Sequence, residues 1–351
     1  MRGVDKMKAA IFVKPGKMEV TEVAKPTLQK PTDAIIKIVR ACVCGSDLWW
    51  YRGISKRQAN SLVGHEAIGL VAEVGSAVKN VKVGDFVIVP FTHGCGHCAA
   101  CQAGFDGNCL NQEAGSNGGY QGQYLRYYNA DWGLVKIPGQ PADYTDDQLN
   151  SLLALSDVMA TGYHAAFTAE VKTGDTVVVI GDGAVGLCGV IGAKLRGAKR
   201  IISLSHHEDR AKLAREFGAT DIVSERGDDA VQKVLELTDG AGADAVLECV
   251  GATSAIEQAG QVARPGAVIG RVGVPQTEPS SNQLFWKNIG LRGGLASVTT
   301  HDRAVLLAAV LEGKIKPGKV FTKRFTLDDV QAAYEAMDKR EAIKSLLIIS
   351  Q

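Results

Sequence analysis

A short apolar run in the middle of the chain predicts a buried strand followed by a sharp turn. Residues 177–180 read Val-Val-Val-Ile. Four β-branched residues in a row suit a strand that is covered on both faces, as in a parallel sheet flanked by helices. The next six residues read Gly-Asp-Gly-Ala-Val-Gly, and an apolar segment rich in alanine, leucine and glycine follows.

The six-residue turn has the spacing G-x-G-x-x-G, which is typical of a dinucleotide-binding site. Gly181 permits the bend, Gly183 lets backbone approach a pyrophosphate, and Gly186 lets the next helix pack closely on the strand. Ala184 and Val185 complete the turn. Phosphates are expected at the helix N-terminus, where free N–H groups favour negative charge. The alternative is an ordinary glycine-rich connection between strand and helix.

Strand-like and helical segments alternate after this turn. The strand-like segments are 200–204, 221–223, 244–250 and 267–272. Segments with helical periodicity lie between them and include 208–217, 228–238 and 254–263. This alternation predicts an α/β fold with a doubly wound parallel sheet, and it favours the dinucleotide site over the ordinary turn.

The two ends of the chain have a different pattern. Before the helical stretch 144–171, short β-like segments such as 34–40, 69–74 and 86–89 predict an antiparallel β domain. After Gly294 we expect a helix at 303–312, a strand at 320–325, a helix opened by a capping box at 326–329, and a last strand at 345–349. These closing elements can return to the first domain and leave a ligand cleft between two domains.

Composition and charge exclude several classes of function. The chain of 351 residues has 39 basic and 38 acidic side chains, a net charge of +1, which leaves no basic footprint for nucleic acid or an anionic membrane. It has no apolar run of transmembrane length and no signal-peptide hydrophobic region. We therefore expect a cytoplasmic protein.

A cluster of cysteines indicates a structural metal site. Four of the eight cysteines fall on one short segment, namely Cys95, Cys98, Cys101 and Cys109. Four thiolates close the tetrahedral shell of Zn²⁺ and leave no position for substrate. The alternative is a set of buried or disulfide-paired cysteines. His93 and His97 lie beside the cluster, where either replaces a thiolate or is a solvated loop residue.

A second candidate metal site is scattered along the chain. Cys44, His65 and Asp157 would supply a thiolate, an imidazole and a carboxylate. Three protein ligands leave an open position for water or substrate, as catalytic zinc requires. Spacing alone leaves open that each is an ordinary packing or surface residue.

The ordered combination of motifs resembles a known family. Its parts are Cys44-Gly45-Ser46-Asp47, Gly64-His65-Glu66, the four-cysteine loop, Asp157 before Thr161-Gly162-Tyr163, and the glycine turn. From Lys8 to Ile349 the chain is similar to the zinc-dependent alcohol dehydrogenases of the medium-chain dehydrogenase/reductase superfamily. The resemblance implies a GroES-like catalytic domain at 1–157, completed by 295–351, and a Rossmann domain at 158–294.

The resemblance also implies roles for the residues of the catalytic site. Cys44, His65 and Asp157 match the catalytic zinc ligands, with aspartate where many relatives have cysteine. Asp47 matches a group that orients His65. Glu66 either approaches the zinc or is the buried partner of a basic side chain.

The implied reaction is hydride transfer between a nicotinamide and an alcohol or carbonyl carbon. Ser46 matches the hydroxyl that takes the alcohol proton, but Trp49 stands where relatives have the histidine that completes the relay. Without that histidine, either the cofactor ribose together with water or His164 would have to complete the proton relay. Trp49 and Trp50 either line a pocket for a small apolar or aromatic substrate or belong to the core.

The residues after the second strand of the alternating region indicate the cofactor. NAD sites normally carry an acid about 20 residues beyond the glycines, but this chain has Ser205, followed by His206, His207 and Arg210. We predict NADP(H) over NAD(H), although these side chains are alternatively surface residues. The resemblance adds Thr161 and, for the pyrophosphate, Lys344, which is otherwise a surface lysine.

The sequence thus predicts a zinc-dependent, NADP-dependent alcohol dehydrogenase or carbonyl reductase, a homodimer or homotetramer with two zinc ions per chain. The alternatives are a polyol or other specialised dehydrogenase of the same superfamily, and a dinucleotide-binding protein of the same fold without catalysis.

Overall fold

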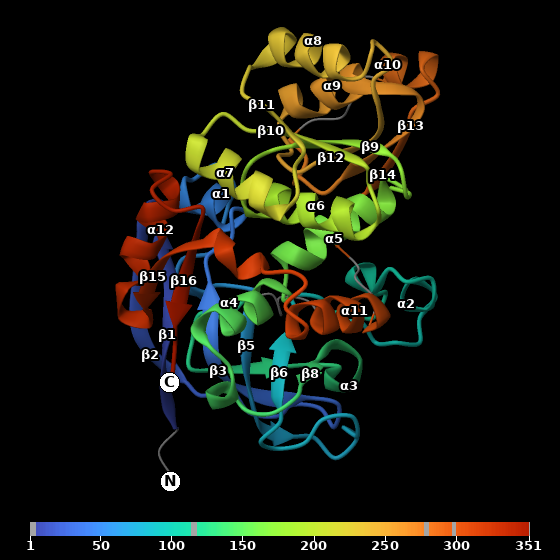
Figure 1. Ribbon diagram of the computed structural model, residues 1–351. Helices are drawn as coiled ribbons and strands as arrows, with labels where there is room; N and C mark the ends of the chain where they lie inside the picture. Colours follow the sequence, from blue (N-terminus) through green and yellow to red (C-terminus); the bar gives the residue numbers. More distant parts are fainter. Residues whose placement is uncertain (1–4, 114–117, 277–280, 297–299, 351) are drawn as a thin grey trace. The chain divides into compact units, whose positions relative to one another are not determined.

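A computed structural model describes residues 5–113, 118–276, 281–296 and 300–350 (Figure 1). The chain forms two compact units. The first comprises Met1–Asp157 with Val298–Gln351, and the second comprises Val158–Ser297.

The second unit is built on a six-stranded sheet whose neighbouring strands all pair in parallel. Its strand order is β11-β10-β9-β12-β13-β14. The strands are β9 (Thr176–Ile180), β10 (Arg200–Leu204), β11 (Asp221–Val223), β12 (Ala243–Glu248), β13 (Ala263–Arg271) and β14 (Gly290–Gly293). The helices are α5 (Val158–Thr168), α6 (Ala184–Leu195), α7 (Glu208–Phe217), α8 (Gly227–Leu237), α9 (Thr253–Val262) and α10 (Ser281–Trp286).

The predicted doubly wound sheet is confirmed. Figure 1 shows α8 and α9 on one face of the sheet and α5 and α6 on the other. The strand order reverses between β9 and β12, and the carboxyl end of β9 at such a reversal is where open α/β sheets bind ligands. The valines of β9 are fully buried, as a strand covered on both faces requires. The sequence did not predict α10 and β14.

The glycine turn connects β9 to α6 with little space to spare. Gly181 has a φ of +111°, a conformation that side chains disfavour. A Cβ atom on Gly186 would lie 1.9 Å from the carbonyl oxygen of Gly181, so only glycine lets α6 start this close to the strand. A Cβ atom on Gly183 would meet nothing within 4 Å. The three glycines therefore have separate functions.

The first unit contains two sheets of mainly antiparallel strands. One has the order β2-β1-β4 and the other the order β15-β16-β3-β5-β6-β8, with β7 paired to β3. The strands are β1 (Lys6–Lys14), β2 (Lys17–Ala24), β3 (Ala34–Cys42), β4 (Ser61–Leu62), β5 (Ala67–Val74), β6 (Phe86–Val89), β7 (Tyr124–Tyr127), β8 (Val135–Ile137), β15 (Phe321–Thr326) and β16 (Lys344–Ile348). The predicted antiparallel β architecture is confirmed here, apart from the parallel pair β15 and β16.

Helices of the first unit are short and connect these strands. The α-helices are α1 (Asp47–Tyr51), α2 (Ala99–Gln102), α3 (Ala130–Gly133), α4 (Asp146–Ala154), α11 (Thr300–Leu311) and α12 (Val330–Asp338). The 3₁₀ helices are η1 (Asp106–Asn108), η2 (Pro141–Asp143), η3 (Pro317–Val320) and η4 (Leu327–Asp329). The predicted capping box between Thr326 and Asp329 is present, and it opens η4 just before α12. Among the described residues, none of the helices has the length and apolar character needed to cross a membrane.

We expect Gly186→Ala to destabilise the second unit by about 3 kcal/mol, because its Cβ collides with backbone that cannot move without shifting α6. Equilibrium denaturation measures the change. The matched control is Gly183→Ala, which puts the same methyl group into open space and should stay within about 1 kcal/mol of the unsubstituted protein. Equal losses in the two variants would contradict this account of the turn.

Candidate functional site

Strand register in the first unit brings distant residues to one end of its larger sheet. β3 and β5 are antiparallel with Ala41 opposite Ala67. Cys44 lies just beyond the end of β3 and His65 just before the start of β5, so the two meet at the same edge. β16 pairs antiparallel with β3, with Leu346 opposite Cys42, which brings Lys344 to this edge as well.

The three proposed catalytic ligands converge with Glu66. Their ligand atoms, one from each of the four residues, all lie within 4.8 Å of one another. The carboxylate oxygen Oδ2 of Asp157 is 3.2 Å from Nε2 of His65 and 3.8 Å from Sγ of Cys44. Nε2 of His65 is 3.9 Å from Oε1 of Glu66. The structure therefore places these side chains close enough to share one ion.

Local backbone geometry holds these side chains in place. Gly64 has a φ of +86°, and a Cβ atom there would lie 2.5 Å from Cγ of the buried Gln121. This tight approach fixes the direction in which the chain enters His65. Asp157 lies in the turn between α4 and the following helix. Backbone constraint on each side of the site thus reduces the freedom of its ligands.

Asp47 contacts two of the proposed ligands from the start of α1. Its Oδ2 accepts a hydrogen bond of 3.1 Å from the backbone N–H of Cys44. Its Oδ1 lies 3.6 Å from Nδ1 of His65, on the ring nitrogen opposite the one that faces Asp157. This position suits a residue that orients His65.

Glu66 forms a buried ion pair with Lys344. The ammonium group of Lys344 donates to Oε1 of Glu66 at 2.6 Å and to the carbonyl of Val43 at 3.1 Å, and both side chains are 1% exposed. The interpretation of Lys344 as a surface lysine is therefore wrong. Oε2 of Glu66 is buried without a hydrogen-bond partner among the described residues. Burial raises the pKa of Glu66, and Lys344 opposes that change.

The donor set fits a Zn²⁺ ion. A thiol, an imidazole and carboxylates are the groups that zinc takes in proteins, and an unpartnered buried oxygen stands beside them. The electrostatic environment of His65 is also negative. Although burial opposes it, the negative groups Asp47 and Cys44 raise the pKa of His65 well above its ordinary value. The same field attracts a divalent cation.

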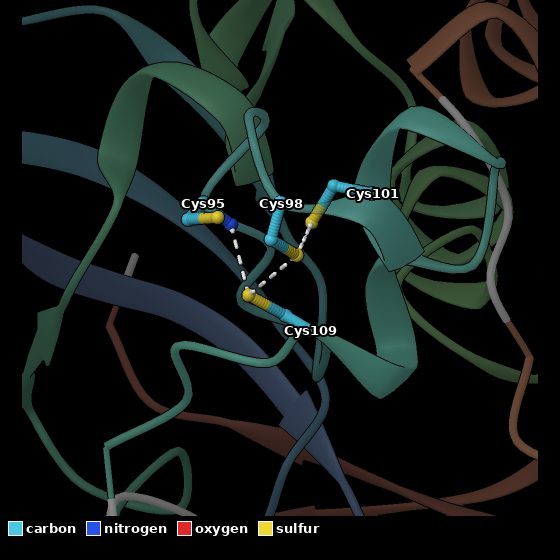
Figure 2. A group of neighbouring side chains, drawn as sticks. All are labelled: Cys95, Cys98, Cys101 and Cys109. Carbon is cyan, nitrogen blue, oxygen red and sulfur yellow. Dashed lines mark hydrogen bonds between the residues drawn. The ribbon is translucent and has the colours of Figure 1, made fainter.

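The four clustered cysteines form a second metal-binding arrangement, which Figure 2 shows. Sγ of Cys98 lies 3.5 Å from Sγ of Cys101 and 3.9 Å from Sγ of Cys109. A disulfide requires about 2.05 Å. A zinc tetrahedron with Zn–S bonds of about 2.3 Å has sulfur–sulfur edges of about 3.8 Å. The separations therefore fit four thiolates around one ion and exclude the disulfide alternative for these pairs.

Backbone amides around the loop favour thiolates. The N–H of Cys95 donates to Sγ of Cys109 at 3.3 Å, and the N–H of Leu110 donates to Sγ of Cys98 at 3.5 Å. Amides of Cys101 and Leu110 lower the pKa of Cys98 to about 6. These donors favour the thiolate at Cys98, whereas burial raises the pKa of Cys101 to about 12 and also raises the pKa of Cys109.

The neighbouring histidines are outside this four-sulfur group. His93 is buried, with Nε2 3.0 Å from the hydroxyl of Tyr120, so it is not a solvated loop residue. His97 is exposed, and its Nδ1 lies 2.9 Å from the carbonyl of Cys95. From α11, Arg303 reaches Asp106 next to the loop in a buried ion pair of 3.4 Å.

At the glycine turn, the structure adds a residue that the sequence did not indicate. Asp182, the second residue of the turn, accepts hydrogen bonds from the Ser205 hydroxyl at 3.0 Å and from Nη1 of Arg210 at 3.2 Å. Burial raises its pKa, but Arg210 and Ser205 outweigh that effect, so the pKa lies below its ordinary value. The signal was an acid between two glycines, just beyond the end of β9, whose neighbour β10 ends one residue before Ser205.

The remaining predicted cofactor residues are placed as follows. His206 is exposed, and its Nδ1 lies 2.7 Å from the carbonyl of Ser224. His207 is the half-buried N-cap of α7. Thr161 and His164 are buried on α5. Ala184 and Val185, the fourth and fifth residues of the glycine turn, are the first two residues of α6.

The two predicted pocket residues differ in burial. Trp50 belongs to the hydrophobic core of the first unit, where its ring centroid lies 5.2 Å from that of Phe12 and 5.5 Å from that of Tyr334. This packing favours the core alternative for Trp50, and a substrate pocket lined by Trp49 or Trp50 stays a prediction. Trp49 and Ser46, on other sides of the same short helix, are only half-buried.

Comparison with known proteins identifies the family. The family model described as "Alcohol dehydrogenase GroES-like domain" matches residues 30–139, and the one described as "Zinc-binding dehydrogenase" matches residues 184–310. Zinc-type alcohol dehydrogenase B of Aspergillus flavus is 36% identical over 97% of this chain and 81% of its own length. The chain belongs to the zinc-dependent alcohol dehydrogenase family.

Other alcohol dehydrogenases agree with this assignment. The NADP-dependent isopropanol dehydrogenase of Thermoanaerobacter brockii is 32% identical over 98% of this chain and 100% of its own. A solved structure of zinc-dependent alcohol dehydrogenase 2 from Streptococcus pneumonia, in its apo form, is 33% identical, covers 98% and 99% of the two chains, and has a TM-score of 0.88. The predicted family and its combination of GroES-like and Rossmann folds are confirmed.

We expect two zinc ions per chain, with each site removable separately. Cys98→Ser should reduce the zinc content from two to one and lower the melting temperature, because the metal stabilises a loop with few apolar contacts. Cys44→Ala should also leave one zinc but change the melting temperature less. Plasma mass spectrometry and thermal unfolding measure both effects. The control Cys42→Ala changes a buried thiol outside both ligand groups and should keep two zinc ions per chain. A zinc content of one in the unsubstituted protein would contradict the assignment of two sites.

Proposed function

We propose that this alcohol dehydrogenase transfers a hydride between NADP(H) and a small alcohol or the corresponding aldehyde or ketone, with zinc at Cys44, His65 and Asp157. The observation that carries the proposal is the convergence of a thiol, an imidazole and a carboxylate from three distant parts of the chain. Three ligands leave a coordination position for a substrate oxygen.

The side chains around this metal site have distinct tasks. Bound Zn²⁺ supplies Lewis acidity that lowers the pKa of an alcohol oxygen or polarises a carbonyl. Asp47 holds the His65 ring and the Cys44 backbone in the ligating orientation. Lys344 balances the charge of Glu66, and Ser46 takes the alcohol proton.

The glycine turn is proposed to hold the pyrophosphate of the cofactor. Gly183 leaves open space at the turn, and the backbone N–H groups at the start of α6 favour phosphate. A cofactor held there would supply the hydride chemistry, and the task of the protein would be to align the reacting atoms.

Three observations support NADP(H) and a small substrate. Ser205 occupies the position where an NAD site normally has an acid, and His207 and Arg210 follow it. The relative from Thermoanaerobacter brockii is an NADP-dependent isopropanol dehydrogenase. Half-buried Trp49 would give the pocket an apolar wall, which suits a small apolar or aromatic alcohol. The family resemblance supports a homodimer or homotetramer.

Zinc chemistry at Cys44 predicts a large loss of activity in one variant. Cys44→Ala should lower kcat/KM by at least about a hundredfold in an NADPH-consumption assay over aldehydes and ketones, because a ligand of the Lewis acid is lost. Cys42→Ala makes the same change at a thiol that lies outside the ligand group and should retain activity within about threefold. Undiminished turnover in Cys44→Ala would rule out zinc chemistry there.

Cofactor preference is a separate prediction. The unsubstituted enzyme should have a higher kcat/KM for NADPH than for NADH, since Ser205 does not repel a 2′-phosphate. Steady-state kinetics with one carbonyl substrate measures the ratio. Equal values, or a preference for NADH, would overturn this part of the proposal and leave the zinc chemistry intact.

A further inference from the structure

Three hydrogen-bond donors converge on the carboxylate of Asp182, inside the glycine turn. The Ser205 hydroxyl and the backbone N–H of His206 reach its Oδ2 at 3.0 and 3.3 Å, and Nη1 of Arg210 reaches its Oδ1 at 3.2 Å. Arg210 also approaches the carbonyl of Asp182 at 3.4 Å. A hydroxyl, an amide and a guanidinium around one anion is the donor set that proteins use for phosphate.

Strand register explains why the acid meets these donors. β9 and β10 are parallel neighbours with Ile180 opposite Leu204, so the residues that leave the two strands lie side by side. Ser205 is the first residue beyond β10, at the place where dinucleotide sites contact the 2′ position of the adenosine ribose. Asp182 therefore stands beside the position that distinguishes NADP from NAD.

The contact is shielded enough to affect binding. The side chains of Asp182 and Arg210 are 15% and 14% exposed, so salt screens their interaction less than it would screen a surface pair. A 2′-phosphate carries a charge of about −1.5 to −2. A 2′-phosphate bound here would be repelled by the carboxylate of Asp182. The donors best suited to the phosphate already form hydrogen bonds with that carboxylate.

We propose that Asp182 is a specificity-determining residue that restrains the preference for NADP(H), because its carboxylate competes with the 2′-phosphate for Ser205, His206 and Arg210. This inference rests on the proposed function and refines it. Ser205 admits a 2′-phosphate, while Asp182 weakens its binding. Removal of the Asp182 charge releases Arg210 for the cofactor and removes the repulsion.

Binding of cofactor fragments tests the proposal without catalysis. Isothermal titration calorimetry gives the Kd of 2′,5′-ADP and of 5′-AMP, two probes that differ only in the 2′-phosphate. In Asp182→Asn, which keeps the side-chain shape, we expect 2′,5′-ADP to bind about tenfold more tightly, and 5′-AMP to change by less than about twofold. The NADPH/NADH ratio of kcat/KM should rise by a similar factor. Asp182→Ala serves as the second variant if the amide perturbs folding.

A matched control separates direct competition from a general change in charge. Asp209 is exposed in the first turn of α7, next to Arg210 in sequence, and Asp209→Asn removes the same charge. It should alter the 2′,5′-ADP affinity by less than about twofold. In an Arg210→Gln background the effect of Asp182→Asn should shrink several-fold, because the competed donor is gone.

Two results would overturn the proposal. One is an unchanged ratio of the two affinities in both Asp182 variants. The other is weaker 5′-AMP binding with no gain for 2′,5′-ADP, which would make Asp182 an acceptor for the ribose hydroxyls. A preference of the unsubstituted enzyme for NADH would refute only the proposed cofactor, because the change caused by Asp182→Asn is measured independently.

Discussion

The antiparallel pairing of β3 with β5 is the constraint on which the proposed metal site depends. Ala41 lies opposite Ala67, so the C-terminal end of β3 and the N-terminal end of β5 lie at the same end of the sheet. Cys44, which follows β3, therefore meets His65, which precedes β5. A shift of one residue would turn the side chains of β5 to the other face of the sheet. The register of two paired strands therefore aligns a thiol and an imidazole that are distant in sequence.

Much of this arrangement follows from sequence, because local patterns encode it. Strands β10 and β11 and helix α7 have the bounds expected from periodicity, and the cysteine loop could be identified by spacing alone. The convergence of Cys44, His65 and Asp157 depended on family resemblance, since no local pattern encodes long-range register. The sequence left Trp50 open between pocket and core, because an aromatic run on a short helix does not reveal which ring turns inward. Strand β14, Gly-Leu-Arg-Gly, lacks β-forming character and owes its structure to its neighbour β13.

Both proposed sites combine buried acids with basic partners. Near the metal ligands, Lys344 is paired with Glu66, and in the glycine turn Arg210 is paired with Asp182. In each case a charge that would be costly to bury alone has a partner, yet remains next to the place where a ligand is expected. The electrostatics of the protein before binding thus affect which ligands it accepts, in addition to its shape.

The larger sheet of the first unit joins segments from the beginning and the end of the chain. β16 lies between β15 and β3, and Arg303 of α11 reaches back to Asp106 beside the cysteine loop, whereas the Rossmann domain is continuous in sequence. On a ribosome the Rossmann domain can finish folding while β3 still lacks one neighbour. Until β16 has been synthesised, Glu66 therefore lacks the ammonium group of Lys344, so the buried ion pair beside the proposed metal site is completed only when the end of the chain has been made.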